Sequence, residues 1–226
     1  MCGRFTQIQS RDDYLAFLVE EADTDIPYDP EPIGRYNVAP GTKVLLLNNR
    51  EDRLHLDPVV WSYAPGWWDK APLINARVET AATSRMFKSL WNHGRAFVFA
   101  DGWYEWQKEG DKKLPYYIYR KDRKPLFFAV IGKQPFDSGD EAEGFLIVTA
   151  AADKGLVDIH DRRPLVFTPE AALEWMDPET TGAQVSELAL DAAVPADEFT
   201  WHPVTQSIGN VKNQGADLIK NTSDKI

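Results

Sequence analysis

The sequence contains one cysteine, Cys2, among its 226 residues. A single cysteine excludes a framework of internal disulfide bonds, so we expect a reducing environment. No apolar run approaches the ~20 residues that a membrane-spanning helix needs. The N-terminus also lacks the basic region and apolar stretch of a secretory signal peptide. These absences predict a soluble cytoplasmic protein with no membrane partner.

The motifs of several common enzyme classes are also missing. There is no G-x-x-x-x-G-K-[ST] loop, no G-x-G-x-x-G after a strand and no G-x-S-x-G elbow. The four histidines are far apart in the sequence and none lies close to the cysteine: His55, His93, His160 and His202. A structural zinc site needs closely spaced nitrogen and sulfur ligands. We therefore expect no metal, no nucleotide cofactor and no other cofactor.

Basic residues are outnumbered, with 25 Lys and Arg against 35 Asp and Glu, and the formal net charge is −10. This balance argues against a protein that coats nucleic acid through bulk charge, but it does not exclude a local basic groove. The chain is nevertheless 43% hydrophobic and 12% aromatic. Such a composition is typical of a folded protein with a sizeable core.

Three helices are predicted from caps and apolar spacing. Residues 10–21 have Ser10 as a cap, acidic residues in the first turn and an apolar face of Tyr14, Phe17 and Leu18. Residues 80–91 form a second candidate, with an apolar face of Thr83, Met86, Phe87 and Leu90. A third helix begins after Thr168, with Pro169 in its first turn.

Short β-type runs outnumber the helices and often follow one another directly. They cover residues 42–48, 54–63, 95–100, 116–120, 125–131, 144–150 and 163–167. This order predicts an α+β fold: a single domain with largely antiparallel, barrel-like curled β-sheets flanked by a few helices. We expect that domain to span residues 1–226, with the last ~6 residues as a loose tail. No heptad or other dimer signal is present, so we expect a monomer.

Cys2 directly follows Met1 and precedes Gly3, a context in which an aminopeptidase removes the initiator methionine. The new terminus would carry an α-amine and a thiol on neighbouring carbons. These groups titrate near ~7.7–8.0 and ~8.5, so reactive forms of both exist near neutral pH. A 1,2-aminothiol condenses with an aldehyde and closes a five-membered thiazolidine, which is nucleophilic catalysis by an amine. The alternative from position alone is an inert, half-buried small residue.

Three other segments place polar groups beside apolar runs. In "L-I-N-A-R-V-E-T", alternation puts Asn75, Arg77 and Glu79 on one face if the segment is extended. "F-V-F-A-D-G-W-Y-E-W" presents Glu105 between aromatics, where a raised pKa suits a general acid or base. "L-V-D-I-H-D-R-R-P" places His160 in a short charged link. Taken alone, each of them favours a surface ion pair or a satisfied turn residue over a functional group.

The segment "W-S-Y-A-P-G-W-W-D-K" has more aromatic area than a loop needs. Exposed aromatics beside arginines are how proteins hold unpaired bases. A core role for one or two of these rings is the alternative.

Together these motifs resemble the SRAP family, the SOS-response-associated peptidases. The resemblance rests on "M-C-G-R-F", "R-Y-N-V-A-P-G", "W-S-Y-A-P-G-W-W", "I-N-A-R-V-E-T", "F-A-D-G-W-Y-E-W" and "V-D-I-H-D-R-R-P", which occur in the family's order. It continues through "G-N-V-K-N-Q-G", and only residues 180–198 and the last few look generic.

The resemblance implies a sensor of abasic sites in single-stranded DNA, associated with the nucleoid and replication fork. Family members form a covalent thiazolidine crosslink through the N-terminal cysteine, which shields the lesion from strand cleavage. The implied activity is single-turnover crosslinking with lyase-type Schiff-base chemistry and self-removal of Met1. The implied reactive residues are Cys2, Asn75, Glu105 and His160. The implied DNA contacts are Arg4, Pro40, Trp67, Trp68, Arg77, Arg85 and Arg162.

Two other functions stay open. Cys2 with His160 and either Asn75 or Glu105 would form the nucleophile, base and orienting group of a cysteine peptidase (hydrolase) acting on proteins. Alternatively, the chain is a single-stranded DNA-binding module that works without a covalent bond, in which Cys2 is incidental.

Overall fold

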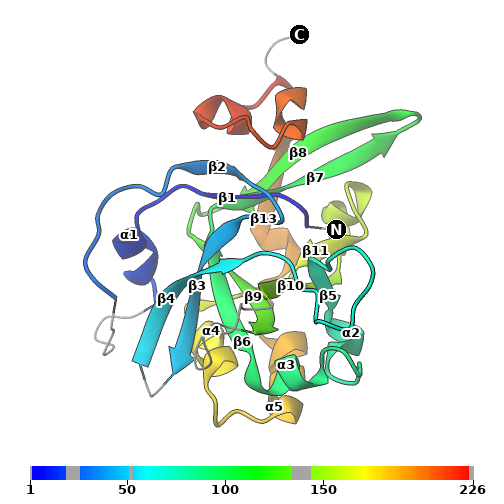
Figure 1. Cartoon of the computed structure of the whole chain (residues 1–226). Helices are drawn as coiled ribbons and strands as arrows, with labels where there is room; N and C mark the ends of the chain where they lie inside the picture. Colours follow the sequence, from blue (N-terminus) through cyan, green and yellow to red (C-terminus); the bar gives the residue numbers. More distant parts are fainter. Residues whose placement is uncertain (1, 19–25, 51–52, 134–143, 224–226) are drawn as a thin grey trace.

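The computed structural model describes residues 2–18, 26–50, 53–133 and 144–223, and its architecture is α+β with two mainly antiparallel sheets (Figure 1). The smaller sheet has the order β13-β8-β7-β1-β2. Its strands are β13 (Phe199–Pro203), β8 (Lys112–Arg120), β7 (Gly102–Glu109), β1 (Phe5–Gln7) and β2 (Arg35–Val38). The tip of the β7–β8 hairpin projects from the body of the molecule (Figure 1).

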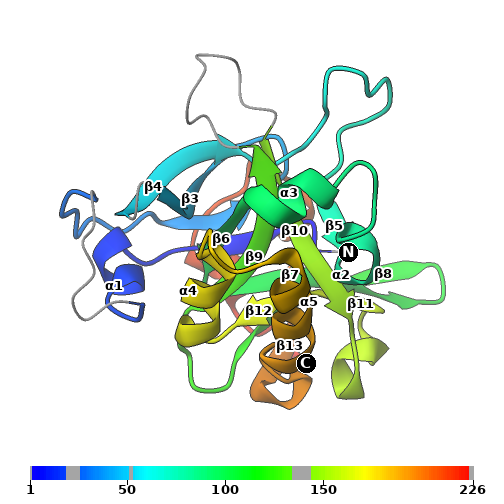
Figure 2. The same cartoon turned by 90° about the horizontal axis from the view of Figure 1, so that it is seen from below.

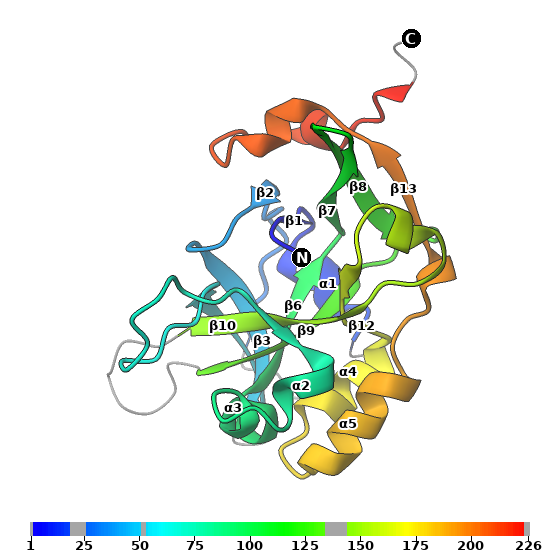
Figure 3. The same ribbon diagram turned by 90° about the vertical axis from the view of Figure 1, so that its right-hand side faces the viewer.

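The larger sheet has the order β11-β10-β9-β6-β3-β4, with β12 paired to β9 and β5 paired to β10. Its strands are β11 (Arg162–Pro164), β10 (Gly144–Ala151), β9 (Leu126–Lys133), β6 (Arg95–Ala100), β3 (Lys43–Arg50), β4 (Arg53–Val60), β12 (Val166–Phe167) and β5 (Asn75–Arg77). Both strand orders are open-ended and the sheets curl around one another without closing (Figure 3). The predicted fold class is confirmed.

Alternation along the strands divides the core into two layers on either side of the larger sheet. In β6, Val98 faces the smaller sheet and belongs to the core cluster that contains Trp103 of β7 and Phe128 of β9. Phe97 and Phe99 point the other way, into a core covered by helices. This reversal at every residue is the side-chain period of a strand, and it explains why β6 is apolar throughout.

Helices cover the outer face of the larger sheet (Figure 2). They are α1 (Arg11–Leu15), α2 (Val78–Ala81), α3 (Lys88–His93), α4 (Pro169–Met176) and α5 (Gly182–Asp191). Four short 3₁₀ helices complete the described part: η1 (Lys154–Asp158), η2 (Ala196–Glu198), η3 (Gln206–Gly209) and η4 (Ala216–Ile219). As predicted, Thr168 caps α4 and Pro169 opens it.

The first two predicted helices are shorter than expected. Ser10 forms a capping box with Asp13, but α1 has five residues and Phe17 is 41% exposed, so it does not share the buried face of Tyr14. Residues 19–21 of that prediction lie outside the described residues. The helix predicted over 80–91 is wrong in its middle, because hydroxyl groups compete for the backbone there. Thr83 Oγ1 donates to the Thr80 carbonyl, and Ser84 Oγ accepts from the Met86 amide.

Two further segments differ from expectation. Helix α5 lies in a stretch for which we predict no element, and Thr181 and Gln184 form its capping box. In the predicted loose tail, the Thr222 amide donates to the Pro203 carbonyl at 3.0 Å, and residues 224–226 lie outside the described part. The outer face of the smaller sheet is covered by η3 and η4, which pack on Tyr104, Tyr117 and Tyr119.

Candidate active site

Glu105 lies on strand β7, on the face of that strand that is directed toward the larger sheet. Trp103, two residues earlier on the same face, is fully buried, and Glu105 is only 2% exposed. Burial in this apolar setting disfavours the charged carboxylate and raises the pKa of Glu105 to about 7. A carboxyl group with this pKa can both donate and accept a proton near neutral pH.

His160 follows η1 and lines the same pocket as Glu105. Gln107 ties the two segments together, because its Nε2 donates to the Asp158 carbonyl at 3.0 Å. The result is a distance of 4.0 Å between His160 Nε2 and Glu105 Oε2. Burial lowers the pKa of His160, so the ring is neutral at neutral pH.

Asn75 comes from β5, the single parallel partner among the described strand pairings. Its register opposite Ile147 of β10 puts its side chain on the inner face of the larger sheet. Asn75 Nδ2 donates to the Ile147 carbonyl at 3.4 Å. The buried Oδ1 has no hydrogen-bond partner among the described residues. An acceptor of this kind has the chemistry to bind a donor from a ligand.

Cys2 precedes β1 and packs into the core between the two sheets, where it is fully buried. Burial raises the pKa of its thiol well above the ordinary value, and the nearby Glu105 carboxylate raises it further. The thiol is therefore protonated at neutral pH.

Glu105 and His160 open into a pocket of about 670 Å³. Its other lining residues are Trp106, Lys108, Lys113, Ile159 and Gly209. Lys108 and Lys113 are direct cross-strand neighbours on β7 and β8. Two cations placed opposite one another repel, so this end of the pocket suits an anionic group.

The four arginines named from the sequence differ in their surroundings. Arg77 and Arg85 are exposed. Arg4 is engaged with the protein, because its Nη1 donates to Asn37 Oδ1 at 2.9 Å and to the Ile208 carbonyl at 2.8 Å. Arg162 donates to both carboxylate oxygens of Glu79, at 2.6 and 2.9 Å.

The aromatic segment also divides in two. Trp61 and Tyr63 belong to the core. Trp67 is 68% exposed and meets Trp68 edge to face, with ring centroids 6.0 Å apart. Pro40 is half-buried just before the turn into β3. The exposed face of Trp67 is free to stack on a flat group, while Trp61 is not.

The expectation that Asn75, Arg77 and Glu79 share a face of one strand is wrong for Glu79. Strand β5 ends at Arg77, and Glu79 lies in the first turn of α2. Thr149 was also missed by the sequence analysis, and its carbonyl oxygen accepts a hydrogen bond from Arg162 Nη2 at 2.5 Å. One signal was available, since Thr149 is a polar residue near the end of an otherwise apolar strand.

The described residues contain no group of three or more His, Cys, Asp or Glu side chains arranged to hold a metal ion. In the same part of the chain, every helix is too short or too polar to cross a membrane.

Known proteins are similar to this chain in sequence and in fold. The family model described as SOS response associated peptidase (SRAP) matches residues 1–211. The abasic site processing protein YedK of Escherichia coli strain K12 is 72% identical, over 97% of this chain and 99% of that protein. YoqW of Bacillus subtilis strain 168, which has the same description, is 29% identical over 97% and 99%.

A similar solved structure is that of a phage-related protein from Bordetella bronchiseptica. Its TM-score is 0.77 at 37% identity, covering 91% of this chain and 95% of that one. The family match spans most of the sequence, and the relative from Escherichia coli is covered almost from end to end. The chain therefore belongs to the SRAP family, the SOS response associated peptidases.

Proposed function

We propose that this chain processes abasic sites in DNA, and that its reacting groups are the α-amine and thiol of Cys2 after removal of Met1. The names of the relatives, which describe abasic site processing, support the choice of lesion. The observation that carries the chemistry is the buried Glu105 carboxyl, which has a pKa of about 7, lies 4.0 Å from His160 and electrostatically raises the pKa of the buried Cys2 thiol.

An abasic sugar in its ring-opened form presents an aldehyde at C1′. In the proposed reaction, the C1′–O4′ bond of the sugar breaks as the C1′ hydroxyl gives its proton to the Glu105 carboxylate, and O4′ takes a proton from water while the Nε2–H of neutral His160 hydrogen-bonds to it. The Cys2 amine then bonds to C1′, and the carbinolamine loses water with a proton from Glu105 to give an imine. Asn75, with its amide oxygen directed inward, orients the amine or a sugar hydroxyl.

Sulfur closes the ring in the last step. The Cys2 sulfur bonds to C1′, the S–H proton passes to Glu105, and the imine nitrogen takes a proton. Amine, thiol and aldehyde thus give a thiazolidine and one water, with no oxidant or reductant. An imine promotes β-elimination of the 3′ phosphate, and closure of the ring removes the imine. This step is what would shield the lesion from strand cleavage.

The raised thiol pKa also bears on the alternative of a peptidase that acts on other proteins. A peptidase cysteine is activated by a lowered pKa and a paired base. Burial and the charge of Glu105 instead raise the pKa of the Cys2 thiol. In the proposed reaction a protonated thiol is suitable, because the amine attacks first.

We further propose that the DNA is single-stranded and is bound through its backbone and by stacking, because a site without a base offers no edge to read. The exposed Arg77 and Arg85 suit phosphate contacts. Trp67 and Trp68, with Pro40, would flank the neighbouring bases. Arg4 and Arg162 are already hydrogen-bonded to the protein, so their contribution to DNA binding is the less direct one.

The test is incubation with a single-stranded oligonucleotide that holds one abasic site, followed by a denaturing gel. The wild type should give a shifted band without added reductant. Cys2→Ser keeps the amine but lacks sulfur, so it should cut the strand and give a shifted band only with borohydride. No shift in the wild type, with binding still visible on a native gel, would support the non-covalent alternative.

A further inference from the structure

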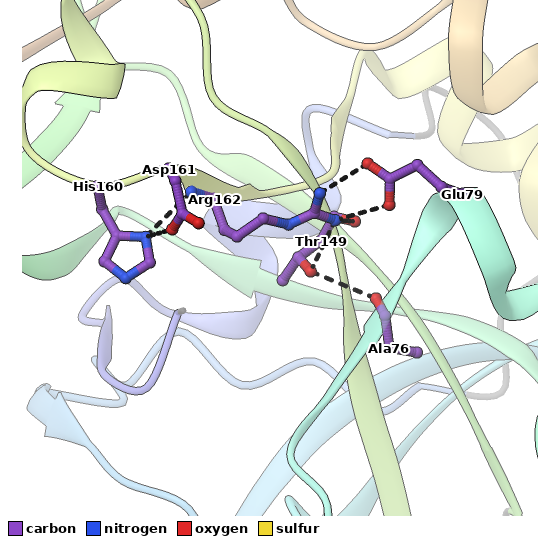
Figure 4. A network of polar contacts seen from close by, with 6 residues as sticks. All are labelled: Ala76, Glu79, Thr149, His160, Asp161 and Arg162. Atoms are coloured by element: carbon purple, nitrogen blue, oxygen red, sulfur yellow. Dashed lines mark hydrogen bonds and ion pairs between the residues drawn. The ribbon is translucent and has the colours of Figure 1, made fainter.

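An ion pair between α2 and β11 lies beside the site (Figure 4). Both carboxylate oxygens of Glu79 accept from the Arg162 guanidinium, Oε1 from Nη1 at 2.6 Å and Oε2 from Nη2 at 2.9 Å. Glu79 is partly exposed, with 48% of its side chain accessible, whereas the Arg162 side chain is only 12% exposed. This bidentate geometry holds the guanidinium in one orientation.

The same guanidinium is attached to strand β10. Nη2 of Arg162 donates to the Thr149 carbonyl at 2.5 Å and lies 3.3 Å from Thr149 Oγ1. Thr149 Oγ1 in turn donates to the Ala76 carbonyl at 3.4 Å, and Ala76 follows Asn75 in β5. Arg162 therefore links three elements: β11, β10 and the β5–α2 segment. Its side chain is largely buried where it does so.

The backbone of Arg162 controls His160. Its amide N–H donates to His160 Nδ1 at 3.0 Å. An amide nitrogen cannot give up its proton, so Nδ1 must carry the lone pair and Nε2 must carry the hydrogen in the neutral ring. This tautomer directs an N–H toward Glu105, 4.0 Å away.

A second group competes for the same nitrogen. Asp161 Oδ1 lies 2.8 Å from His160 Nδ1, a contact that favours a proton on Nδ1 and thus the opposite state. The Asp161 side chain is 80% exposed and has water available, while the Arg162 amide is held by strand pairing of β11 with β10. The position of the Arg162 backbone decides between the two contacts.

We propose that Glu79 is a positioning residue for the reaction. By clamping Arg162 against Thr149, it keeps the Arg162 amide on His160 Nδ1, and so keeps the Nε2–H of His160 directed at Glu105. This inference rests on the proposed function, because it assigns Glu79 to that same site. Glu79 itself touches no reacting atom.

The kinetic test compares single-turnover crosslinking rates at saturating DNA, after the wild type has been shown to crosslink. Glu79→Ala should slow the rate by about tenfold or more, since a ~1 Å misplacement of a reacting group costs up to ~10²-fold. Glu79→Gln, which keeps one acceptor, should recover part of the loss. The DNA concentration giving half the maximal rate should change little. Asp122→Asn is the matched control, since Asp122 holds Arg120 by a similar bidentate pair in the β8–β9 turn.

A double variant distinguishes an effect of Glu79 on the rate that acts through Arg162 from one that is independent of Arg162. If Glu79 acts through Arg162, the double variant Glu79→Ala/Arg162→Ala should react no more slowly than Arg162→Ala alone. Additive losses would overturn the proposal. So would a Glu79→Gln variant that keeps the wild-type rate and binds DNA more tightly, because Glu79 would then merely compete with phosphate for Arg162.

A measurement without DNA tests the positioning role of Glu79 separately from the proposed crosslinking reaction. With only four histidines, ¹⁵N NMR can follow the His160 ring, which His160→Gln assigns. The wild type should show a hydrogen on Nε2, and Glu79→Ala should show a mixture of tautomers. An unchanged tautomer in Glu79→Ala would overturn the positioning role even if the wild type crosslinks. A wild type that never crosslinks would contradict the proposed function instead.

Discussion

Nε2 of His160 lies 4.0 Å from Oε2 of Glu105, and both residues line one pocket. Burial moves their pKa values in opposite directions, raising that of Glu105 to about 7 and lowering that of His160. At neutral pH, Glu105 is divided between its two protonation states, and His160 is a neutral donor. Opposed pKa shifts of this kind are what the proposed reaction requires of its acid–base group and its hydrogen-bond donor.

Glu105→Gln should slow crosslinking by about 10²-fold or more, the usual contribution of a general acid–base group. The wild-type rate should change with pH around 7, where Glu105 titrates. In Glu105→Gln that inflexion should vanish and leave the one from the α-amine, near ~7.7–8.0. Rates measured from about pH 5.5 to about pH 9 span both pKa values and test this expectation. An unchanged inflexion near 7 would assign it to another group.

The same substitution should stabilise the protein at high pH. Folding raises the Glu105 pKa from the ordinary 4.5 to about 7, so the folded state holds this proton more tightly than the unfolded chain. The stability that comes from this proton is fully present below pH 4.5 and is lost as the pH rises through about 7. At about pH 8, Glu105→Gln should therefore gain up to about 3 kcal/mol in free energy of unfolding.

Urea unfolding at about pH 8 and about pH 4.5, on either side of the Glu105 titration, measures this difference. The gain should be present at the higher pH and nearly absent at the lower one. A variant less stable than the wild type at both values would show that Glu105 supports the fold.

Arg77→Gln should weaken binding to single-stranded DNA and reduce the slope of log affinity against log salt by about 0.7, the value for one phosphate contact on a single strand. Arg77 is exposed, so its loss leaves the fold intact. Fluorescence anisotropy over a salt series gives the slope. Lys43→Gln, at an exposed position on β3, is the control, and it should keep the wild-type slope.

Arg95→Met should destabilise the fold by about 3 kcal/mol or more, since buried acceptors lose their donors. Arg95 is 7% exposed and donates to backbone carbonyls, those of Trp91, Asn92, Trp175, Asp177 and Thr180. It thereby joins the ends of α3 and α4. Thermal unfolding tests this, and the crosslinking rate per folded molecule should stay at the wild-type value.

The architecture was predictable where local chemistry and tertiary packing agree. Thr168 and Pro169 begin α4 because the cap and the proline act within one turn. The most apolar runs became strands that are buried on both faces, as in β6 and β9. Residues 82–87 are different, since the hydroxyls of Thr83 and Ser84 bond to the nearby backbone groups of Thr80 and Met86 instead of leaving them to a continuous helix.

The placement of the site residues was less accessible to sequence reasoning. Glu105 stood out as a carboxylate between aromatics, and its burial and raised pKa agree with that interpretation. The contact of Arg162 with Glu79 joins residues that are 83 positions apart, and no local sequence pattern predicts it. Its geometry depends on β10, which holds β5 on one stretch and β11 on another.

In the proposed reaction, the Cys2 amine and sulfur both bond to the sugar carbon. Mass spectrometry of the adduct, after nuclease and protease digestion and without reductant, tests it most directly. The expected N-terminal peptide begins at Cys2, lacks Met1 and carries one abasic nucleotide less one water. Its thiol should also resist alkylation. An adduct that retains Met1, leaves a free Cys2 thiol or maps to a lysine would contradict the account.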